Sequence, residues 1–579
     1  MKTVLHQLGR FKRDTILCIC MTTLEVIMEI LLPFITSVII DQGLEQANLP
    51  VVYRHGILMI VMAFLSLAFG GLAGKFAASA SSGFAANLRE AIYNNIQTFS
   101  FSNIDKFSVP GLVTRMTTDI TNIQNAFMMV IRIAVRSPLT LIFSYIMCLV
   151  ISPRLSLTFL FAVAFLAIVL GSIMVVTIKL FDQVFRKYDA LNASVQENVS
   201  AIRVVKAFVR EDYENDKFSK ASHSLYRLFV KAEGLLAFNN PAMMTAVYFC
   251  IIMVSWFGAR FIVGGSMSTG ELTSLFSYVM SLLMSLMMLS MVVVMISMSM
   301  ASVRRISEVL RETPDLQEPA QPVREVADGS IDFDHVSFSY KHGSGKNALS
   351  DIDLHIHSGE TIGVIGGTGS GKSSLVNLIC RLYDVDSGTV RVGGVDVRSY
   401  DMEELRNQVS VVLQKNTLFS GSILDNLRWG NPQATEQECI AACQAACADE
   451  FIDRLPDGYH THIERGGNNV SGGQKQRLCI ARALLKHPKV LILDDSTSAV
   501  DTATDAKIRA AFARQIPGTT KIIIAQRISS VQDADRILVL ENGQINGFDT
   551  HENLLQSNAI YREIYESQVN GGGDFDQPA

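Results

Sequence analysis

Charged residues are scarce in this sequence. They make up 18% of its 579 residues, whereas ordinary soluble chains carry about 25%, and the mean hydropathy is +0.27. No excess of basic residues accompanies this shortage, since the net charge is −5 and the pI is near 6.2. We therefore expect a membrane protein, and we exclude a nucleic-acid partner, which would require a concentrated basic surface.

A disulfide framework and a cleavable signal peptide are also missing. The nine cysteines are odd in number and scattered over both halves, which favours a reducing cytosol. The first apolar run, 16–40, is too long for a signal-peptide core and lacks a small-residue cleavage site. We expect this run to stay in the protein as a membrane anchor.

Long apolar runs are abundant in the first half of the chain. Six of them approach the roughly 20 residues that cross a hydrocarbon core about 30 Å thick. They cover approximately residues 16–40, 56–74, 137–152, 155–178, 242–263 and 274–302. Lysine and arginine concentrate in 75–136 and 179–235, which places these loops and both termini in the cytoplasm. The polar, periodic parts of the loops, 79–125 and 182–235, predict helices that continue inward and contact the C-terminal half.

The second half of the chain has the pattern of an α/β domain that binds a nucleotide. A Pro-rich linker at 311–325 precedes short β-branched runs that alternate with helical ones. A G-x-x-x-x-G-K-[ST] motif follows the strand-like run 361–365, and this context distinguishes a P-loop from a glycine-rich turn. The motif and the residue after it are Gly366, Gly367, Thr368, Gly369, Ser370, Gly371, Lys372, Ser373 and Ser374. In such a loop backbone N–H groups close around phosphate, Lys372 reaches the outer phosphates, and Ser373 ligates Mg²⁺.

A second apolar run, 490–493, ends in Asp494 and Asp495. Two acids at the tip of a buried strand are typical of P-loop NTPases, in which one carboxylate holds Mg²⁺. We expect Asp494 to be this acid, and we expect ATP and Mg²⁺ to be the cofactors.

A further motif lies between these two, at 469–474, and its spacing alone could be that of a turn before a helix. Together the motifs resemble those of ABC exporter half-transporters of the type IV fold. Val470-Ser-Gly-Gly-Gln matches the LSGGQ signature with Val first, Ser498-Ala-Val-Asp501 matches the D-loop, Glu464-Arg-Gly-Gly is similar to the X-loop, and 197–208 resembles the second intracellular loop. The resemblance covers essentially the whole chain.

This resemblance implies a six-helix transmembrane bundle with long cytoplasmic helical extensions, followed by an α/β P-loop ABC nucleotide-binding domain. We expect the bundle in 1–310, the linker in 311–325, the nucleotide-binding domain in 326–570 and a flexible tail in 571–579. It also implies that Tyr340 stacks on adenine and that Gln414 joins Ser373 and Asp494 at Mg²⁺. The signature residues, which contact ATP held by the P-loop of a second chain, are Ser471, Gly472, Gly473 and Gln474, and the D-loop contributes Asp501.

Two positions depart from the family pattern. Asp495 stands where the family has a Glu that polarises the attacking water, and Gln526 stands where it has a His that contacts the γ-phosphate. A general base out of reach costs roughly 10²–10⁴ in rate, and Gln lacks the imidazolium charge. We therefore expect ATP binding with impaired hydrolysis. Since two nucleotide domains of this family meet head to tail, we expect a heterodimer with a second half-transporter that supplies Glu and His. A slow homodimer in which Asp495 still serves is the alternative.

Candidate residues for the substrate path lie in the first and sixth spans. Glu25 and Glu29 stack one turn apart, and acids within a membrane span indicate function by default. They could attract cationic substrates, or they could instead pair with Arg132 or Arg136 or line a wet cavity without selecting a substrate. One helical face of the sixth span carries methionines, which suit either varied apolar ligands or a helix packing seam. These methionines are Met280, Met284, Met287, Met291, Met295 and Met298.

We expect a subunit of an ATP-driven exporter in a bacterial plasma membrane that moves small hydrophobic or cationic compounds, as in multidrug efflux. Other transport interpretations are a lipid or peptide exporter and an importer with an exporter fold. From another class, a hydrolysis-poor nucleotide domain would also suit an ATP-gated channel or a regulatory nucleotide sensor. The six spans exclude a soluble ABC ATPase of the DNA-repair type.

Overall fold

The computed structural model describes residues 2–340, 347–496 and 500–570, and the chain divides into two units. The helical unit comprises Met1–Thr98 and Phe107–Thr313, and the α/β unit comprises Phe99–Lys106 and Pro314–Ala579. The tail expected at 571–579 lies outside the described residues.

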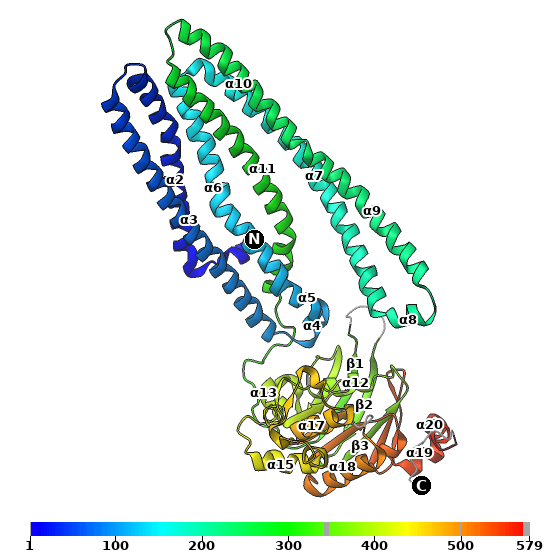
Figure 1. Ribbon diagram of the computed structural model, residues 1–579. Helices are drawn as coiled ribbons and strands as arrows, with labels where there is room; N and C mark the ends of the chain where they lie inside the picture. The colour runs from blue at the N-terminus through cyan, green and yellow to red at the C-terminus, as the bar shows by residue number, and fades with distance from the viewer. Residues whose placement is uncertain (1, 341–346, 497–499, 571–579) are drawn as a thin grey trace. The chain divides into compact units, whose positions relative to one another are not determined.

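Six helical stretches among the described residues are long and apolar enough to cross a membrane (Figure 1). They are Gly9–Leu44, Leu49–Gln97, Val109–Ile151, Pro153–Ser200, Glu211–Val263 and Thr269–Arg311. The six predicted spans are therefore confirmed. The helical elements are α1 (Lys2–His6), η1 (Gly9–Phe11), α2 (Lys12–Val38), η2 (Ile39–Leu44), α3 (Leu49–Gln97), α4 (Phe101–Phe107), α5 (Val109–Thr114), η3 (Arg115–Asp119), α6 (Ile120–Ile151), α7 (Pro153–Ser200), α8 (Ile202–Ala207), α9 (Glu211–Ala237), α10 (Asn239–Val263) and α11 (Thr269–Arg311).

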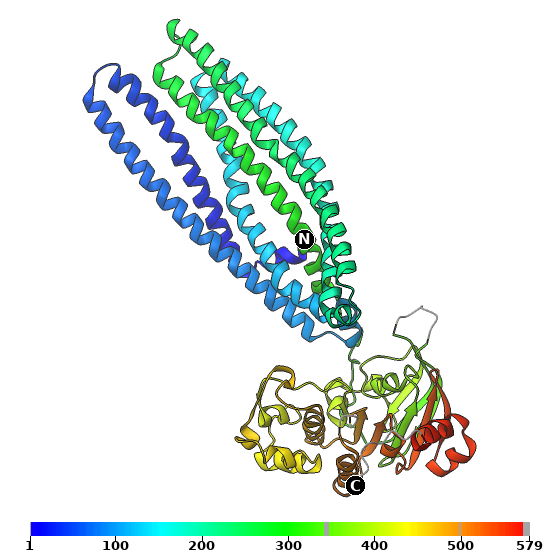
Figure 2. The same ribbon diagram turned by 45° about the vertical axis from the view of Figure 1, so that its right-hand side comes forward.

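The helices run well past their apolar cores, as the polar and periodic inner loops predict. α3 and α7 each continue as one helix of more than 45 residues, because no proline interrupts them after the first turn. Figures 1 and 2 show α2 beside α3, and α7 beside α9 and α10. The connections on the outer side are short, so little of the protein lies on the extracellular side of the membrane.

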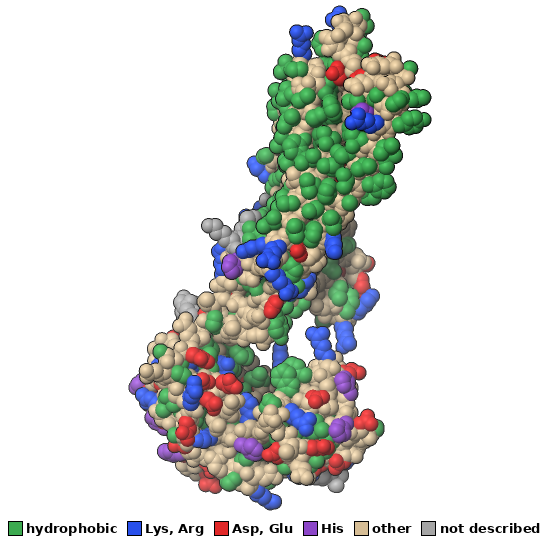
Figure 3. Space-filling model, turned by 90° about the vertical axis from the view of Figure 1, so that its left-hand side faces the viewer, with side chains coloured by type: hydrophobic (Ala, Val, Ile, Leu, Met, Phe, Trp, Pro, Cys, Tyr) green, Lys and Arg blue, Asp and Glu red, His purple; other side chains and the backbone are tan. Residues whose placement is uncertain are grey.

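The outer face of α3 stays apolar and uncovered within this chain. Its exposed large side chains include Ile57, Ile60, Val61, Phe64 and Leu67. Figure 3 shows hydrophobic side chains forming a broad zone over the helical unit on the face in view. Such a zone is what contact with lipid requires, since each helix satisfies its own backbone hydrogen bonds.

Two π-helical turns, η2 and η3, each present an aspartate to α11. Asp41 in η2 accepts hydrogen bonds from the Ser268 hydroxyl (2.6 Å) and the Gly270 N–H (2.8 Å), at the start of α11. Asp119 in η3 is 1% exposed and accepts from Arg305 Nε (2.8 Å), near the end of the same helix. A π turn widens the helix locally and often marks a functional position. Here the two turns fix both ends of α11 to other helices.

The α/β unit is built on a six-stranded sheet with the order β12-β11-β3-β10-β9-β6, parallel except for β12. Ile522 in the middle of β10 pairs with Ile362 of β3 on one side and Ile492 of β9 on the other. β9 and β10 are buried at every position, and seven of their ten residues are Val, Leu or Ile, as expected for strands covered on both faces. A four-stranded sheet, β2-β1-β4-β5, and a two-stranded one, β7-β8, complete the unit.

Helices surround these sheets, and the α/β P-loop fold expected for the second half of the chain is confirmed. The strands are β1 (Ile331–Phe338), β2 (Leu349–Ile356), β3 (Thr361–Gly366), β4 (Ser387–Val392), β5 (Val395–Asp396), β6 (Val409–Val412), β7 (Gly421–Ser422), β8 (His462–Ile463), β9 (Val490–Asp494), β10 (Thr520–Ile524), β11 (Arg536–Glu541) and β12 (Gln544–Asp549). The helices are α12 (Lys372–Ile379), α13 (Met402–Gln408), α14 (Ile423–Leu427), α15 (Glu436–Ala445), α16 (Asp449–Ile452), α17 (Gly472–Leu484), α18 (Thr502–Gln515), α19 (His551–Ser557) and α20 (Ala559–Asn570). Short 3-10 turns are η4 (Val397–Ser399), η5 (Gly458–His460), η6 (Arg465–Gly467) and η7 (Ile528–Ser530).

Most of α4 groups with the α/β unit, although it lies within the first inner loop of the chain. The Tyr383 hydroxyl donates to Asp105 (2.8 Å), and the Ser102 hydroxyl donates to Asp315 (2.6 Å). The rings of Phe101 and Tyr383 lie 6.2 Å apart between centroids. The first inner loop thus contacts the C-terminal half, as expected. A single boundary at residue 310 would place α4 in the helical domain, although most of α4 groups with the α/β unit. The exact limits of the functional domains stay a prediction.

We expect Arg305→Ala to destabilise the helical unit. The change leaves the buried Asp119 carboxylate without its guanidinium, and breaking a buried pair typically costs about 3–5 kcal/mol. Arg305 is itself partly exposed, so we expect the lower end of this range. Thermal unfolding of the purified protein in detergent measures the effect. Arg304→Ala is the matched control, because it removes the same charge from an adjacent exposed position. Equal unfolding midpoints for the two variants would contradict the assigned role of the Asp119 pair.

Candidate functional site

Loops after four neighbouring parallel strands bring the candidate residues of the α/β unit to one edge. The P-loop follows β3, Gln526 comes soon after β10, Asp494 ends β9 with Asp495 beside it, and Gln414 follows β6. The strand order β3-β10-β9-β6 differs from the chain order, so segments far apart in sequence become neighbours. The carboxyl edge of a parallel sheet is where ligands of such folds bind.

The P-loop forms a cradle of backbone donors. Gly371 has φ +99°, and a Cβ there would lie 2.7 Å from Leu349 Cδ2, so only glycine fits this conformation and contact. α12 begins at the next residue and points its free N–H groups into the loop. The Lys372 ammonium lies over the loop, donating to the carbonyls of Gly366 (2.7 Å) and Gly367 (2.8 Å). Burial lowers the pKa of Lys372, while the nearby carboxylates of Asp494 and Asp495 raise it in part. A helix N-terminus, loop amides and a cation together fit a phosphate chain.

Asp494 and Ser373 form the oxygen-rich side of this edge. The Ser373 hydroxyl, at the start of α12, is near enough to the Asp494 carboxylate to affect its pKa. Burial raises the pKa of Asp494, and the Ser373 hydroxyl and the charge of Lys372 act against it. Carboxylate, hydroxyl and amide oxygens are the donors that Mg²⁺ prefers, so the residues present fit this metal.

Asp495 is held by two amide side chains. Gln526 Nε2 donates to Asp495 Oδ2 at 2.8 Å, and Gln414 Nε2 donates to the same oxygen at 3.2 Å. The backbone of Asp495 is left-handed, with φ +49°, and its N–H donates to the carbonyl of Ile524 in β10 (3.0 Å). The two departures from the family pattern are therefore in direct contact, and two donors compete with water for the same carboxylate oxygen.

Tyr340 lies at the entrance of the same loop. Its hydroxyl is 3.0 Å from Ser374 Oγ in α12, and its ring contacts those of Phe338 and Tyr383 at centroid distances of 4.9 and 5.1 Å. The ring is half-exposed, which leaves a face open for an aromatic base. Residues 341–346, next to it in the chain, lie outside the described residues.

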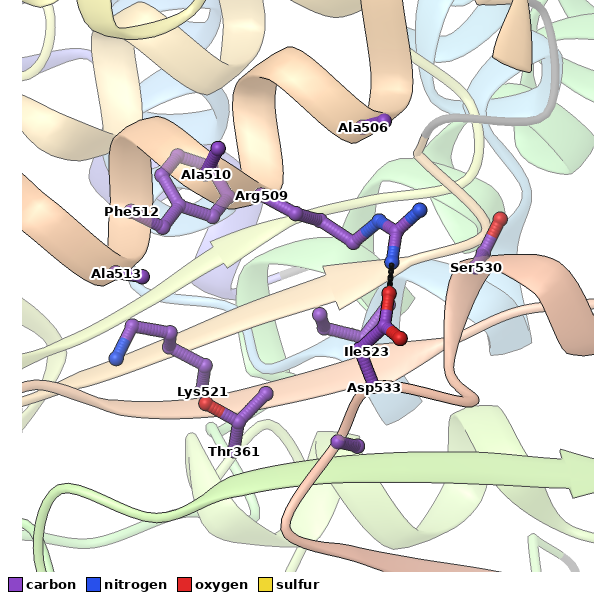
Figure 4. A pocket seen from close by; sticks show the side chains of 11 residues that line it. Thr361, Ala506, Arg509, Ala510, Phe512, Ala513, Lys521, Ile523, Ser530 and Asp533 are labelled. Carbon is purple, nitrogen blue, oxygen red and sulfur yellow. Dashed lines mark hydrogen bonds and ion pairs between the residues drawn. The ribbon is translucent and has the colours of Figure 1, made fainter. Parts of the chain in front are cut away.

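A cavity of about 300 Å³ occupies a different part of the α/β unit, between α18 and the beginning of β10 (Figure 4). Arg509 crosses it and pairs with Asp533 at 2.7 Å, and Thr361 and Lys521 line it from the first residues of β3 and β10. The P-loop and Gln526 follow the opposite ends of these strands, so the cavity is separate from the candidate site.

Comparison with known proteins gives matches over nearly the whole chain. The profile described as "ABC transporter transmembrane region" matches residues 15–309, and the one described as "ABC transporter" matches residues 349–498. The Bacillus subtilis protein named "Uncharacterized ABC transporter ATP-binding protein YfiB" is 36% identical over 549 residues, which cover 95% of each chain. A Mycobacterium tuberculosis protein with the same description, Rv1273c, is 34% identical over 564 residues, 96% of each chain. The chain belongs to the ABC transporters.

Among solved structures, the one described as "Structure of a bacterial Atm1-family ABC exporter with ATP bound" has a TM-score of 0.83 and 25% identity. It covers 96% of this chain and 99% of its own. This ABC transporter is thus a half-transporter with the exporter fold and an ATP-hydrolysing nucleotide domain. It is a multi-pass membrane protein whose nucleotide domain lies in the cytoplasm.

The signature residues of the transporter cap a helix on an open surface. Ser471 is the N-cap of α17: its Oγ accepts from the Gln474 N–H (3.3 Å), and the Gln474 side chain accepts from the Ser471 N–H (2.8 Å). Gly472 and Gly473 form the first turn, which leaves backbone N–H groups free at the surface. Asp501 of the D-loop likewise caps α18 through the Thr504 N–H (2.9 Å), whereas Ser498 and Ala499 lie outside the described residues.

The sequence motifs did not mark Gln568, which holds the backbone around Gln526. Its Nε2 donates to the Gln526 carbonyl (2.8 Å), and its Oε1 accepts from the Ile528 N–H (2.9 Å). α20 presents Tyr561, Ile564 and Tyr565 to the core of the unit. The sequence signal was weak: Gln568 takes the last place of an i, i+3, i+4, i+7 stripe that is otherwise apolar.

The membrane candidates form an ion cluster. Arg136 Nη1 lies 2.6 Å from Glu25 Oε1, and Arg136 Nη2 lies 2.7 Å from Glu29 Oε2. Of the two arginines considered as partners, Arg136 makes these pairs. Among the methionines of α11, Met284 and Met291 are exposed, whereas Met287 and Met295 are half-buried and Met287 packs on the core. The methionine face therefore serves packing in part, and its role in a substrate path stays a prediction.

Gln568→Ala should loosen the segment that carries Gln526. The change removes the acceptor of the Ile528 N–H, and a typical hydrogen bond contributes about 1 kcal/mol, which corresponds to roughly fivefold faster amide exchange. Hydrogen–deuterium exchange of the peptide that contains Ile528 gives the readout. Ser567→Ala is the control, because its hydroxyl donates to the Ile564 carbonyl within α20. Unchanged exchange in the Gln568 variant would show that this side chain does not anchor the segment.

Proposed function

We propose that this transporter is one subunit of a heterodimeric exporter whose own P-loop binds Mg²⁺ and ATP but hydrolyses ATP slowly. The observation that carries the proposal is the contact of Gln526 and Gln414 with a single oxygen of Asp495. An aspartate is one methylene shorter than the glutamate of the family, and here its outer oxygen already accepts two hydrogen bonds. A water molecule has to compete with both donors, so this carboxylate is poorly placed to orient it.

Binding of ATP is assigned to residues that keep the family pattern. The P-loop amides and Lys372 surround the phosphates, and the open face of Tyr340 stacks on adenine. Ser373, Gln414 and Asp494 would hold Mg²⁺, which when bound supplies charge neutralisation at the β- and γ-phosphates. The remaining P-loop positions, which shape the cradle, are Gly366, Gly367, Thr368, Gly369, Ser370, Gly371 and Ser374.

The heterodimer follows from the contrast between two parts of the chain. Ser471, Gly472, Gly473 and Gln474 match the family signature and lie on an open surface, so they are suited to complete the ATP site of a partner. By contrast, Asp495 and Gln526, beside the P-loop of this chain, depart from the family pattern. Pairing with a second half-transporter that has Glu and His gives one fast site, whereas pairing with an identical chain gives two slow ones.

The six spans carry out transport, and α4 transmits changes at the nucleotide site to them. α4 contacts Tyr383, which in turn contacts the ring of Tyr340, so a change at the nucleotide can reach this inner loop. The charged cluster of α2 and α6 and the exposed methionines of α11 suit small hydrophobic or cationic compounds. The direction is outward, as in the exporter whose fold the chain shares, and the membrane lipid is the other constant partner.

Substitutions on the two sides of the chain should have unequal effects on the complex. Ser471→Ala removes a donor from the site that the partner's P-loop would form, and we expect a loss of ATP turnover of about tenfold or more. Lys372→Ala weakens nucleotide retention at the slow site and should leave most of the turnover. Steady-state ATPase and filter binding of labelled ATP, both on the complex purified from membranes, separate these effects. Equal losses of turnover in the two variants would support the slow homodimer instead.

The double change Asp495→Glu with Gln526→His should raise ATPase activity per complex. Glutamate restores the reach of the carboxylate, and histidine restores a group that can carry charge toward the γ-phosphate. Each single variant is a control, since it leaves one altered partner of the contact in place. Purified complex with no rise in turnover for the double variant, at unchanged ATP affinity, would count against the impaired-site proposal.

A further inference from the structure

The ion cluster in the middle of the membrane spans has an uneven charge. Two carboxylates, from Glu25 and Glu29 of α2, share the single guanidinium of Arg136 on α6, so the three groups together carry a net charge of −1. Arg132, one turn along α6, forms no ion pair with either acid among the described residues, and its Nη1 lies instead toward Gly74 of α3. A structural pair between two helices would need only one acid. The second acid therefore needs an explanation of its own.

The two acids differ in their surroundings. Glu25 is buried, and Gly70 of α3 leaves room for its carboxylate, since a Cβ at Gly70 would lie 2.9 Å from Glu25 Oε1. Its Oε2 is also buried and has no hydrogen-bond partner among the described residues. The side chains of Glu29 and Arg136 are 39% and 35% exposed. A charge facing hydrocarbon at this depth costs several kcal/mol, so the exposed side of Glu29 is suited to a polar surrounding inside the assembled transporter rather than to lipid.

Contacts between α2 and α11 fix the depth of the cluster relative to the methionines. The Ser274 hydroxyl donates to the Pro33 carbonyl, and the Tyr278 hydroxyl donates to the Ile30 carbonyl, both at 2.7 Å. As the residue number rises by four on α11 it falls by three on α2, so the two helices are antiparallel and keep nearly equal steps. This register can be continued by one turn toward the cytoplasm.

Continued in this way, Glu29 lies level with Met280 and Glu25 lies level with Met284, to within about 1.5 Å of helical rise. The two methionines are 47% and 43% exposed. Flexible, polarizable side chains and a carboxylate that shares its guanidinium with a second acid thus occur at the same depth of one bundle. A methionine surface adapts to apolar groups of varied shape, whereas a desolvated carboxylate selects for charge.

We propose that this slice of the bundle is a binding site for an amphiphilic organic monocation. Its apolar body contacts Met280 and Met284, and its single positive charge is held by Glu29, while Arg136 and Glu25 fix the position of that carboxylate. One positive charge brings the cluster to neutrality, which is the favourable state in a low-dielectric region. The inference rests on the proposed function and narrows the substrate from hydrophobic or cationic compounds to monocations.

Equilibrium binding without nucleotide tests the site independently of ATP use. The probes are tetraphenylphosphonium, a monocation, and triphenylphosphine oxide, a neutral compound of similar shape, each measured by dialysis against the purified transporter complex with empty-micelle correction. Glu29→Gln is nearly isosteric and makes the cluster neutral, because the pair of Glu25 with Arg136 remains. We expect it to weaken tetraphenylphosphonium binding about tenfold, as the loss of one charged contact would, and to leave triphenylphosphine oxide binding unchanged.

If the cluster selects its ligand by charge, a substitution that makes the cluster more negative should have the opposite effect on tetraphenylphosphonium binding from Glu29→Gln. Arg136→Gln makes the cluster more negative and should strengthen tetraphenylphosphonium binding. Glu45→Gln is the matched control, since it removes one carboxylate that interacts with Thr269 at the start of α11, and it should change neither probe. If Glu29→Gln leaves tetraphenylphosphonium binding unchanged, or weakens both probes equally, the cluster is a structural contact and the proposal fails.

ATP-driven export into inverted vesicles distinguishes this inference from the proposed function. Charge-selective binding without ATP-dependent accumulation of any probe would refute the exporter and retain the monocation site. Accumulation of triphenylphosphine oxide and tetraphenylphosphonium at equal rates by wild type and Glu29→Gln would retain the exporter and refute the site.

Discussion

The side-by-side pairing of β3, β10, β9 and β6 is the constraint on which the rest of the α/β unit depends. Burial of Val, Leu and Ile on both faces holds these strands in register, and their shared direction puts four loops at one edge. The hydrogen bonds from Gln526 and Gln414 to Asp495 exist because the strands that carry these residues are neighbours. A shift of register by one residue would move each side chain of that strand to the other face of the sheet and displace the loop that follows. The position of the polar site therefore depends on the packing of the apolar sheet.

At this edge, gripping a triphosphate and breaking it depend on different side chains. In the proposed ATP site, grip relies on backbone amides, a helix terminus, Lys372 and the oxygens of Ser373 and Asp494, none of which the altered positions replace. Cleavage needs one carboxylate to orient water and one group to follow the charge of the leaving phosphate. Two substitutions in mutual contact can therefore separate the two tasks without disturbing the fold around them.

The membrane half shows a related use of incomplete pairing. In the bilayer an ion pair that is fully neutral needs no ligand, whereas one with a surplus charge favours any mobile group of opposite sign that can reach it. The proposed monocation site, with Arg136 between two glutamates, is of the second kind. Asp119 with Arg305 belongs to the first, and it lies where η3 meets α11 rather than in the middle of a span.

The sequence was sufficient to predict the architecture of both halves of the chain. Apolar run lengths gave the six spans, and the P-loop motif between a strand and a helix gave the nucleotide fold, because both depend on local pattern. The choice of Arg136 over Arg132 was not predictable, since one turn of α6 decides which arginine meets α2 and only packing sets that rotation. The grouping of α4 with the α/β unit, and the two donors on Asp495, also arise from contacts between distant segments. Their residue types are visible in the sequence, but their proximity is not.

The two hydrogen bonds between the Gln568 side chain and the segment after β10 have a consequence for biosynthesis. Gln568 follows Gln526 by 42 residues, so the ribosome releases the strand and its loop well before the side chain that anchors them. At the several residues per second of translation, this interval lasts seconds, long compared with the folding of local elements. Until α20 has been made, the segment after β10 therefore lacks the side chain that holds the backbone of Gln526 and Ile528.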